Sequence, residues 1–128
     1  MEPESSDIRD YRDLVVWREA MDIAELVYSL TRAFPREEAF GLTAQMRRSA
    51  VSIPSNIAEG FGRAQRQSYI QFLRIAQGSL KELETQAQLA ARVGLLASES
   101  LSEFLGRSER LGKRLVMYVR SLEAKGRA

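Results

Sequence analysis

The sequence contains no histidine and no cysteine. Without imidazole, the chain lacks the commonest general base and the ligand on which most zinc and di-iron sites depend. Without thiols it can form no disulfide, which agrees with a reducing compartment. These absences disfavour a conventional enzyme, and we expect a protein that uses no cofactor, no metal and no small-molecule substrate.

Membrane and export signals are missing as well. No apolar run approaches the roughly 20 residues that a membrane-spanning helix needs. Residues 1–13 are polar and acidic, whereas a secretory signal is basic and then apolar. We therefore expect a cytoplasmic protein that does not contact a membrane. With 128 residues, 45% of them apolar, the chain has the size and composition of one domain with one core.

Charge is distributed unevenly along the chain. Residues 1–40 carry five arginines against ten acidic residues, whereas residues 41–128 carry fourteen basic residues against seven acidic ones. Sixteen of the nineteen basic residues are arginine, whose planar guanidinium favours bidentate contacts with phosphate or carboxylate. A GC-rich genome would also enrich arginine, so both explanations stay open at this level.

Apolar residues recur at the three-to-four-residue spacing of amphipathic helices in four segments: 14–34, 42–61, 66–93 and 101–122. The connections are short, so consecutive helices should run antiparallel. The sequence therefore predicts an all-α fold, an up-down-up-down antiparallel four-helix bundle, as a single domain over residues 1–128. We expect residues 1–12 to form a flexible acidic N-terminal arm and residues 124–128 a flexible C-terminal tail.

Two residues inside these segments disfavour a regular helix. Pro54 removes one backbone hydrogen bond and clashes with the carbonyl of Ala50, so the second helix should be kinked or split there. Ser52, Ser55 and Asn56 could satisfy the freed backbone groups. Gly78 in the third helix costs about 1 kcal/mol relative to alanine, and we expect a close helix approach to compensate.

Helix ends and stops are also predicted. Asp13 is the expected N-cap of the first helix, and Ser100 with Glu103 has the spacing of a capping box for the fourth. Gly94 is the expected stop of the third helix.

Two motifs carry a resemblance to a known family. Residues 42–63 read LTAQMRRSAVSIPSNIAEGFGR, and residues 78–84 read GSLKELE. Over roughly residues 13–119 the chain resembles the bacterial four-helix-bundle family of 23S rRNA-intervening sequence proteins, and distantly the accessory variability protein of retroelements. The resemblance implies a ring-like homo-oligomer, a pentamer. We expect the motif residues to be structural: Pro54, Asn56, Glu59, Gly60, Gly78, Ser79, Glu82 and Glu84.

A basic cluster is the first candidate site. Residues 43–81 contain a single acidic residue, Glu59. The same stretch contains six basic residues: Arg47, Arg48, Arg63, Arg66, Arg74 and Lys81. Arg63 and Arg66 flank the start of the third helix, whose free N–H groups also attract anions. The pattern predicts contact with phosphates of RNA or DNA. The alternative is a solvated face with ion pairs, in which Glu59 or Glu82 would pair with Arg47, Arg48 or Arg74.

Surplus apolar residues are the second candidate site. Trp17, Met21 and Tyr28 form a second stripe on the first helix, and Phe72 lies beside the main stripe of the third. They belong either to a wide core stripe or to a subunit interface, and the resemblance favours the interface.

These patterns favour a non-enzymatic homo-oligomeric bundle that binds nucleic acid, RNA or a ribonucleoprotein, through an arginine-rich surface. The alternative is a protein–protein adaptor or assembly module without nucleic-acid binding. A carboxylate-only metal site at Glu59, Glu82 and Glu84 is the least favoured hypothesis, because bundle metal sites usually include histidine.

Overall fold

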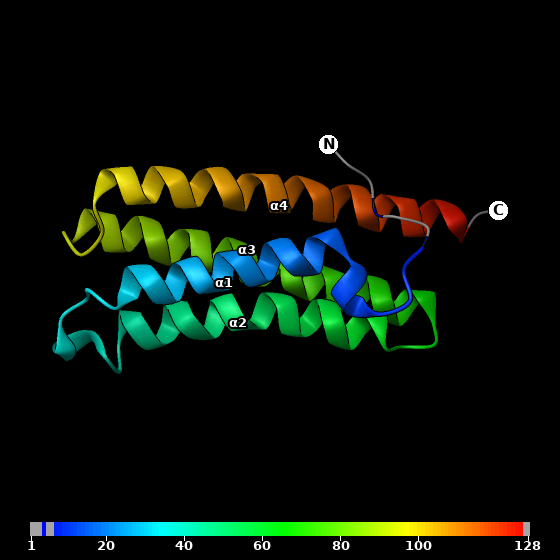
Figure 1. Cartoon of the computed structure of the whole chain (residues 1–128), viewed down its shortest axis with the longest axis horizontal. Coiled ribbons are helices and arrows are strands. Elements are labelled where there is room, and N and C mark those ends of the chain that lie inside the picture. Colours follow the sequence, from blue (N-terminus) through cyan, green and yellow to red (C-terminus); the bar gives the residue numbers. More distant parts are fainter. Residues whose placement is uncertain (1–3, 5–6, 127–128) are drawn as a thin grey trace.

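Four helices form the protein. The computed structural model describes residue 4 and residues 7–126. Consecutive helices run in opposite directions (Figure 1), which confirms the all-α up-down-up-down bundle, and the described residues contain no strand. The elements in chain order are η1 (Tyr11–Asp13), α1 (Val15–Thr31), η2 (Arg36–Glu38), α2 (Leu42–Phe61), α3 (Arg66–Arg92) and α4 (Ser98–Lys125).

The helices are arranged as a square in cross-section. Helix α1 lies against α2 and α4, helix α3 lies against the same two, and the diagonal pairs have no Cα atoms within 8 Å of each other among the described residues. The α1–α2 and α3–α4 connections lie at one end of the bundle (Figure 1). The α2–α3 turn and the C-terminal end of α4 lie at the other, which we call the turn end. The bundle therefore has four side faces, and the α1–α2 face is opposite the α3–α4 face.

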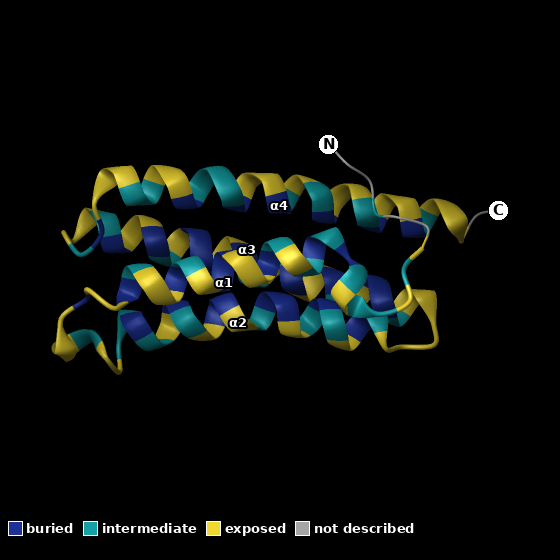
Figure 2. Ribbon diagram, viewed as in Figure 1, coloured by how far each residue is buried: buried dark blue, intermediate teal, exposed yellow. Residues whose placement is uncertain are grey.

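The core is formed by apolar residues from all four predicted helical segments. Buried residues face inward on all four helices (Figure 2), and each large aliphatic side chain so buried stabilises the fold by about 1.5–3 kcal/mol. None of the helices among the described residues is both long and apolar enough to cross a membrane. Fully buried residues of these four segments include Ile23, Val27, Met46, Ile53, Ile57, Leu73, Leu80, Leu83, Phe104, Leu111 and Leu115.

Two predicted helix caps are wrong. Asp13 lies in η1, and Leu14 takes the N-cap position of α1. Ser100 and Glu103 lie inside α4, which follows Ala97 and begins one turn earlier than predicted. Leucine and alanine carry no side-chain acceptor, so the sequence gives no capping signal at either true boundary.

The N-terminal segment supplies a cap from a distance. The Glu4 carboxylate accepts the backbone N–H groups of Val15 and Val16 at 2.6 and 2.8 Å. Of the arm that we expected to be flexible, residues 1–3 and 5–6 lie outside the described residues. Of the expected C-terminal tail, α4 includes residues 124 and 125, and residues 127–128 lie outside the described part.

Helix α2 continues through Pro54. Of the two predicted alternatives, a kinked or a split helix, the split is excluded, and Pro54 itself is buried. The Asn56 side-chain amide donates to the Ser52 carbonyl oxygen at 2.8 Å and to the Ser52 hydroxyl at 2.9 Å. The Ala50 carbonyl, which Pro54 leaves without its helical donor, is therefore not the acceptor of Asn56. The Asn56 side chain thus bonds across the turn that contains Pro54, and the helix continues past the proline.

The predicted close approach at Gly78 is also wrong. A Cβ atom added there would have no heavy atom of the described residues within 4 Å. The close approach occurs at Gly60, where a Cβ would lie 2.6 Å from Cβ of Phe72 and 3.0 Å from the ring of Tyr69. Gly60 therefore sets the distance between α2 and α3 near the turn end.

Candidate interaction surfaces

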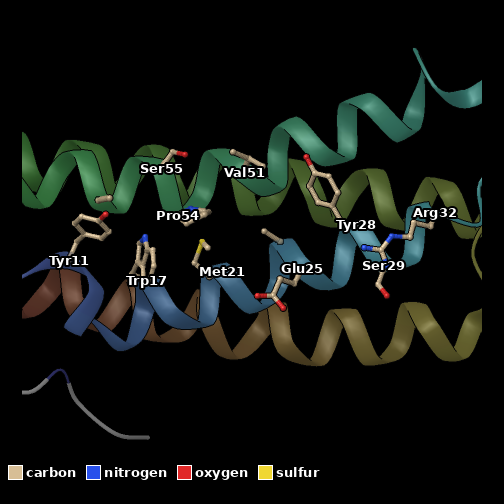
Figure 3. A pocket seen from close by; sticks show the side chains of 12 residues that line it. Tyr11, Trp17, Met21, Glu25, Tyr28, Ser29, Arg32, Val51, Pro54 and Ser55 are labelled. Atoms are coloured by element: carbon tan, nitrogen blue, oxygen red, sulfur yellow. The ribbon is translucent and has the colours of Figure 1, made fainter.

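Three of the four predicted interface residues line one open groove between α1 and α2. Trp17, Met21 and Tyr28 extend from α1 toward α2 (Figure 3), and Val51 and Pro54 lie on the opposite wall. The groove has a volume of about 710 Å³. We call it the α1–α2 groove. Its lining is mainly apolar, with Glu25 and Arg32 as its two charged side chains.

Local contacts position three aromatic side chains at this groove. The rings of Tyr11 and Trp17 meet edge to face at 5.2 Å between centroids. The Arg47 guanidinium lies 4.5 Å over the Tyr28 ring, and its Nε donates to the Thr31 hydroxyl at 2.9 Å. Tyr28 is still 39% exposed, so a large aromatic surface is available to a partner.

Phe72, the fourth predicted interface residue, lies elsewhere. It is half-buried on α3, packs against Gly60, and the Arg63 guanidinium lies 4.8 Å over its ring. The predicted interface set is therefore divided: Phe72 helps to hold α2 on α3 and supports Arg63, whereas the other three face outward together.

The turn end gathers two of the predicted phosphate-binding residues. Arg63 and Arg66 are both exposed, and Arg66 begins α3. Gln65, the N-cap of α3, makes no side-chain capping bond within the described residues, and the first turn of α3 contains no acid. Arg66 also lies against the end of α4, because a Cβ on Gly126 would be 3.2 Å from its guanidinium. Two cationic residues thus flank the start of α3, which has neither a side-chain cap nor an acid in its first turn.

The other four basic residues lie on different faces. Arg47 lies in the α1–α2 contact described above, and Arg48 lines a polar hollow between α2 and α3. Arg74 pairs with Glu123 at 2.8 Å, and Lys81 pairs with Glu84 at 3.0 Å. The six basic residues of the sequence prediction therefore do not form a single surface in one copy of the chain.

The family model described as "23S rRNA-intervening sequence protein" matches residues 12–117. The chain belongs to this family.

A similar crystal structure comes from Bacteroides thetaiotaomicron, a protein of unknown function from the S23 ribosomal protein family. It aligns with a TM-score of 0.75 and 24% identity, covering 82% of this chain and 98% of that one. At this identity the likeness supports the fold alone. A comparison with curated proteins found no match.

The family-motif residues mainly connect α2 to α3. The Ser52 and Ser79 hydroxyls share a hydrogen bond of 2.8 Å, and the Ser49 hydroxyl donates to Glu82 at 3.0 Å. Glu82 therefore accepts from a serine, and the expected pairing of Glu82 with an arginine is wrong. Glu59 pairs with Arg63 at 3.2 Å, not with Arg47, Arg48 or Arg74.

The third motif carboxylate connects α3 to α4. Glu84 is buried, accepts a short hydrogen bond from the fully buried Ser108, and also accepts from Lys81. Glu59, Glu82 and Glu84 thus have three different sets of partners. Among the described residues, no three acidic side chains come together as a metal site would require.

Two features of the site region were missed by sequence reasoning. The first is that Arg114 of α4 pairs with Glu19 of α1 at 2.9 Å and is largely buried. Burial raises the pKa of Glu19, and the nearby Arg114 only partly opposes this. The second missed feature is an apolar groove between α3 and α4 (the α3–α4 groove), of about 670 Å³. Both depend on helix register, which composition does not reveal.

Proposed function

We propose that this protein is a non-enzymatic homo-oligomeric bundle that binds nucleic-acid phosphates through its turn end. The observation that carries the proposal is the pair Arg63 and Arg66 at the uncapped start of α3. A phosphate there would gain two guanidinium contacts together with the free N–H groups and the positive dipole end of a 27-residue helix. The family description refers to 23S rRNA, which agrees with RNA as the ligand.

Self-association is the second part of the proposal, and the α1–α2 groove supports it. Met21, Tyr28 and Val51 are 37%, 39% and 44% exposed within one apolar groove. Such a surface is typical of a protein contact. A ring, a pentamer by the family resemblance, would repeat the turn end in each subunit, and the repetition would raise avidity without new contacts.

A fluorescence-anisotropy titration with structured RNA tests the phosphate site. Nuclease-treated protein with both Arg63→Ala and Arg66→Ala should bind at least tenfold more weakly than wild type, a difference of about 1.4 kcal/mol. The matched control is Arg36→Ala with Arg92→Ala, which removes two exposed arginines at the opposite end of the bundle. Equal weakening by both double variants would overturn the assignment to the turn end.

The second candidate function is a protein–protein adaptor without nucleic-acid binding. The observation that favours it is that Arg63, Arg74 and Lys81 each pair with a carboxylate of this chain, so part of the basic charge is already compensated. In this case the wild type would assemble but show no RNA or DNA binding at low salt in the same titration. A measurable affinity lost on raising salt would contradict it.

A further inference from the structure

The α3–α4 groove has no role in the proposed function. Leu80 forms its floor, and Val116 and Met117 are 39% and 50% exposed along it. Gly112 also lines it; a Cβ there would be 3.7 Å from the Leu80 side chain, so glycine leaves that part of the floor uncovered. The groove is therefore a second exposed apolar surface of nearly the same volume as the α1–α2 groove.

The two apolar grooves lie on opposite faces of the bundle. The α1–α2 face and the α3–α4 face share no helix, because the helices form a square. The two remaining faces are polar: Arg48, Ser52 and Glu82 line the α2–α3 face, and Asp22 and Arg107 line the α1–α4 face. The two apolar grooves thus lie on opposite sides, whereas Ile75 and Leu89 are exposed on α3 outside both grooves.

The two apolar grooves differ in the charged residues that line them. Lys113 and Arg120 line the α3–α4 groove, and neither is in an ion pair between residues of the described chain. Glu25 lines the α1–α2 groove on its α1 side (Figure 3) and is likewise outside those ion pairs. Over the whole helices, α1 carries three acids and one arginine, whereas α4 carries six basic and four acidic residues.

We propose that the α1–α2 groove of one copy docks on the α3–α4 groove of a second copy. This inference rests on the proposed self-association and specifies which surfaces meet. Glu25 of α1 would face Lys113 and Arg120, and Arg32 would face Glu109, the acid of the α3–α4 groove. Such a contact is heterologous, so every copy uses both faces and binds two neighbours. For five copies to close into the proposed ring rather than an open filament, each copy must be rotated by one-fifth of a turn relative to the next. A contact between two α1–α2 grooves would instead leave each α3–α4 groove uncovered.

Mixing two blocked variants tests this pairing. Met21→Arg places a cation in the α1–α2 groove, and Met117→Arg places one in the α3–α4 groove; both positions are exposed, at 37% and 50%, so the fold should tolerate them. We expect each variant alone to be monomeric by light scattering, because each lacks one of the two faces. An equimolar mixture should form a 1:1 dimer through the two intact faces.

The controls separate the possible failures. Leu89→Arg changes an equally exposed apolar residue outside both grooves and should leave the wild-type oligomer intact. A monomeric wild type would overturn the proposed self-association itself. Two other results would overturn only the heterologous pairing, provided that the wild type is oligomeric. One is that Met117→Arg still assembles fully, and the other is that the mixture of the two variants stays monomeric. Circular dichroism of each variant establishes that the bundle is folded.

Discussion

The guanidinium of Arg63 lies 3.2 Å from the carboxylate of Glu59, four residues earlier in the chain. Both side chains are about half exposed, so the pair contributes at most about 1 kcal/mol to stability. The same pair nevertheless holds a negative charge beside the arginine that we assign to phosphate binding. The Phe72 ring below the guanidinium, 4.8 Å away, restricts the arginine from the other side.

Removing this carboxylate should strengthen nucleic-acid binding. Glu59→Gln keeps the side-chain size but no longer neutralises Arg63, so we expect a roughly two- to fivefold tighter dissociation constant for structured RNA at low salt, consistent with the modest energy of an exposed pair. Anisotropy titration measures it. Glu37→Gln, an exposed acid at the opposite end, is the control and should change affinity less. Weaker binding of Glu59→Gln would contradict the competition.

Two glycine substitutions should change stability in opposite directions. At Gly60 a new Cβ would overlap Phe72, so Gly60→Ala should lower the free energy of unfolding by about 1–3 kcal/mol. At Gly78 the space is open, so Gly78→Ala should raise it by up to about 1 kcal/mol through helix propensity. Denaturant unfolding of both variants measures the difference. A stabilised Gly60→Ala would show that α2 and α3 do not pack this closely.

Ser108 should stabilise the buried carboxylate of Glu84. Ser108→Ala removes a donor to a carboxylate that lies at 9% exposure, which should cost about 1–3 kcal/mol of unfolding free energy. The control is Ser102→Ala, an exposed position on the same helix, which should change stability by less than about 0.5 kcal/mol. Equal stabilities of the two variants in urea would contradict the role of this hydrogen bond.

Glu19 should give the protein a specific pH dependence. Burial raises its pKa in the folded state, so its contribution to stability is fully present below the unfolded-state pKa and is lost as pH rises through the folded-state value. Relative to Glu19→Gln, wild type should therefore gain stability as pH falls from about 7 to about 4.5. Chemical unfolding at several pH values measures this difference.

Asp13 provides a control of opposite sign. Backbone N–H groups of Arg9 and Asp10 lower the pKa of Asp13. The stabilisation of the fold by ionised Asp13 is fully present above the unfolded-state pKa and is lost as pH falls through the folded-state pKa. Acidification should therefore lower the free energy of unfolding of wild type relative to that of Asp13→Asn. The same trend in both comparisons would contradict the assigned environments.

Local periodicity was sufficient to predict the bundle. The apolar pattern over residues 42–61 predicted the bounds of α2 that the structure shows, Leu42–Phe61. Gly41 and Gly62 lie directly outside these bounds. The spacing of Trp17, Met21 and Tyr28 placed them on one side of α1, where they line one groove. Gly94, with a φ of 82°, ends α3 at the predicted stop. Each of these predictions depends only on residues close together in the sequence.

Apart from the two helix caps and the local Glu59–Arg63 pair, the errors and omissions involve contacts between distant residues. Arg74 meets Glu123, 49 positions later, and only the register of α3 against α4 determines that pairing. Gly60 and Gly78 look alike in sequence, and only the packing of α2 on α3 distinguishes them. The α3–α4 groove could not be predicted for the same reason, since its walls come from two helices whose relative rotation the sequence does not reveal.

The salt dependence of RNA binding tests the central claim most directly. Association constants of wild type for structured RNA should fall linearly with salt on logarithmic axes, between about 50 and about 200 mM. The slope for Arg63→Ala with Arg66→Ala should be shallower by about 1.4–1.8, since each of the two phosphate contacts contributes about 0.7–0.9. The slope for Arg36→Ala with Arg92→Ala should match wild type. No binding by wild type at low salt, or equal slopes for the turn-end variant and wild type, would contradict nucleic-acid recognition by the turn end.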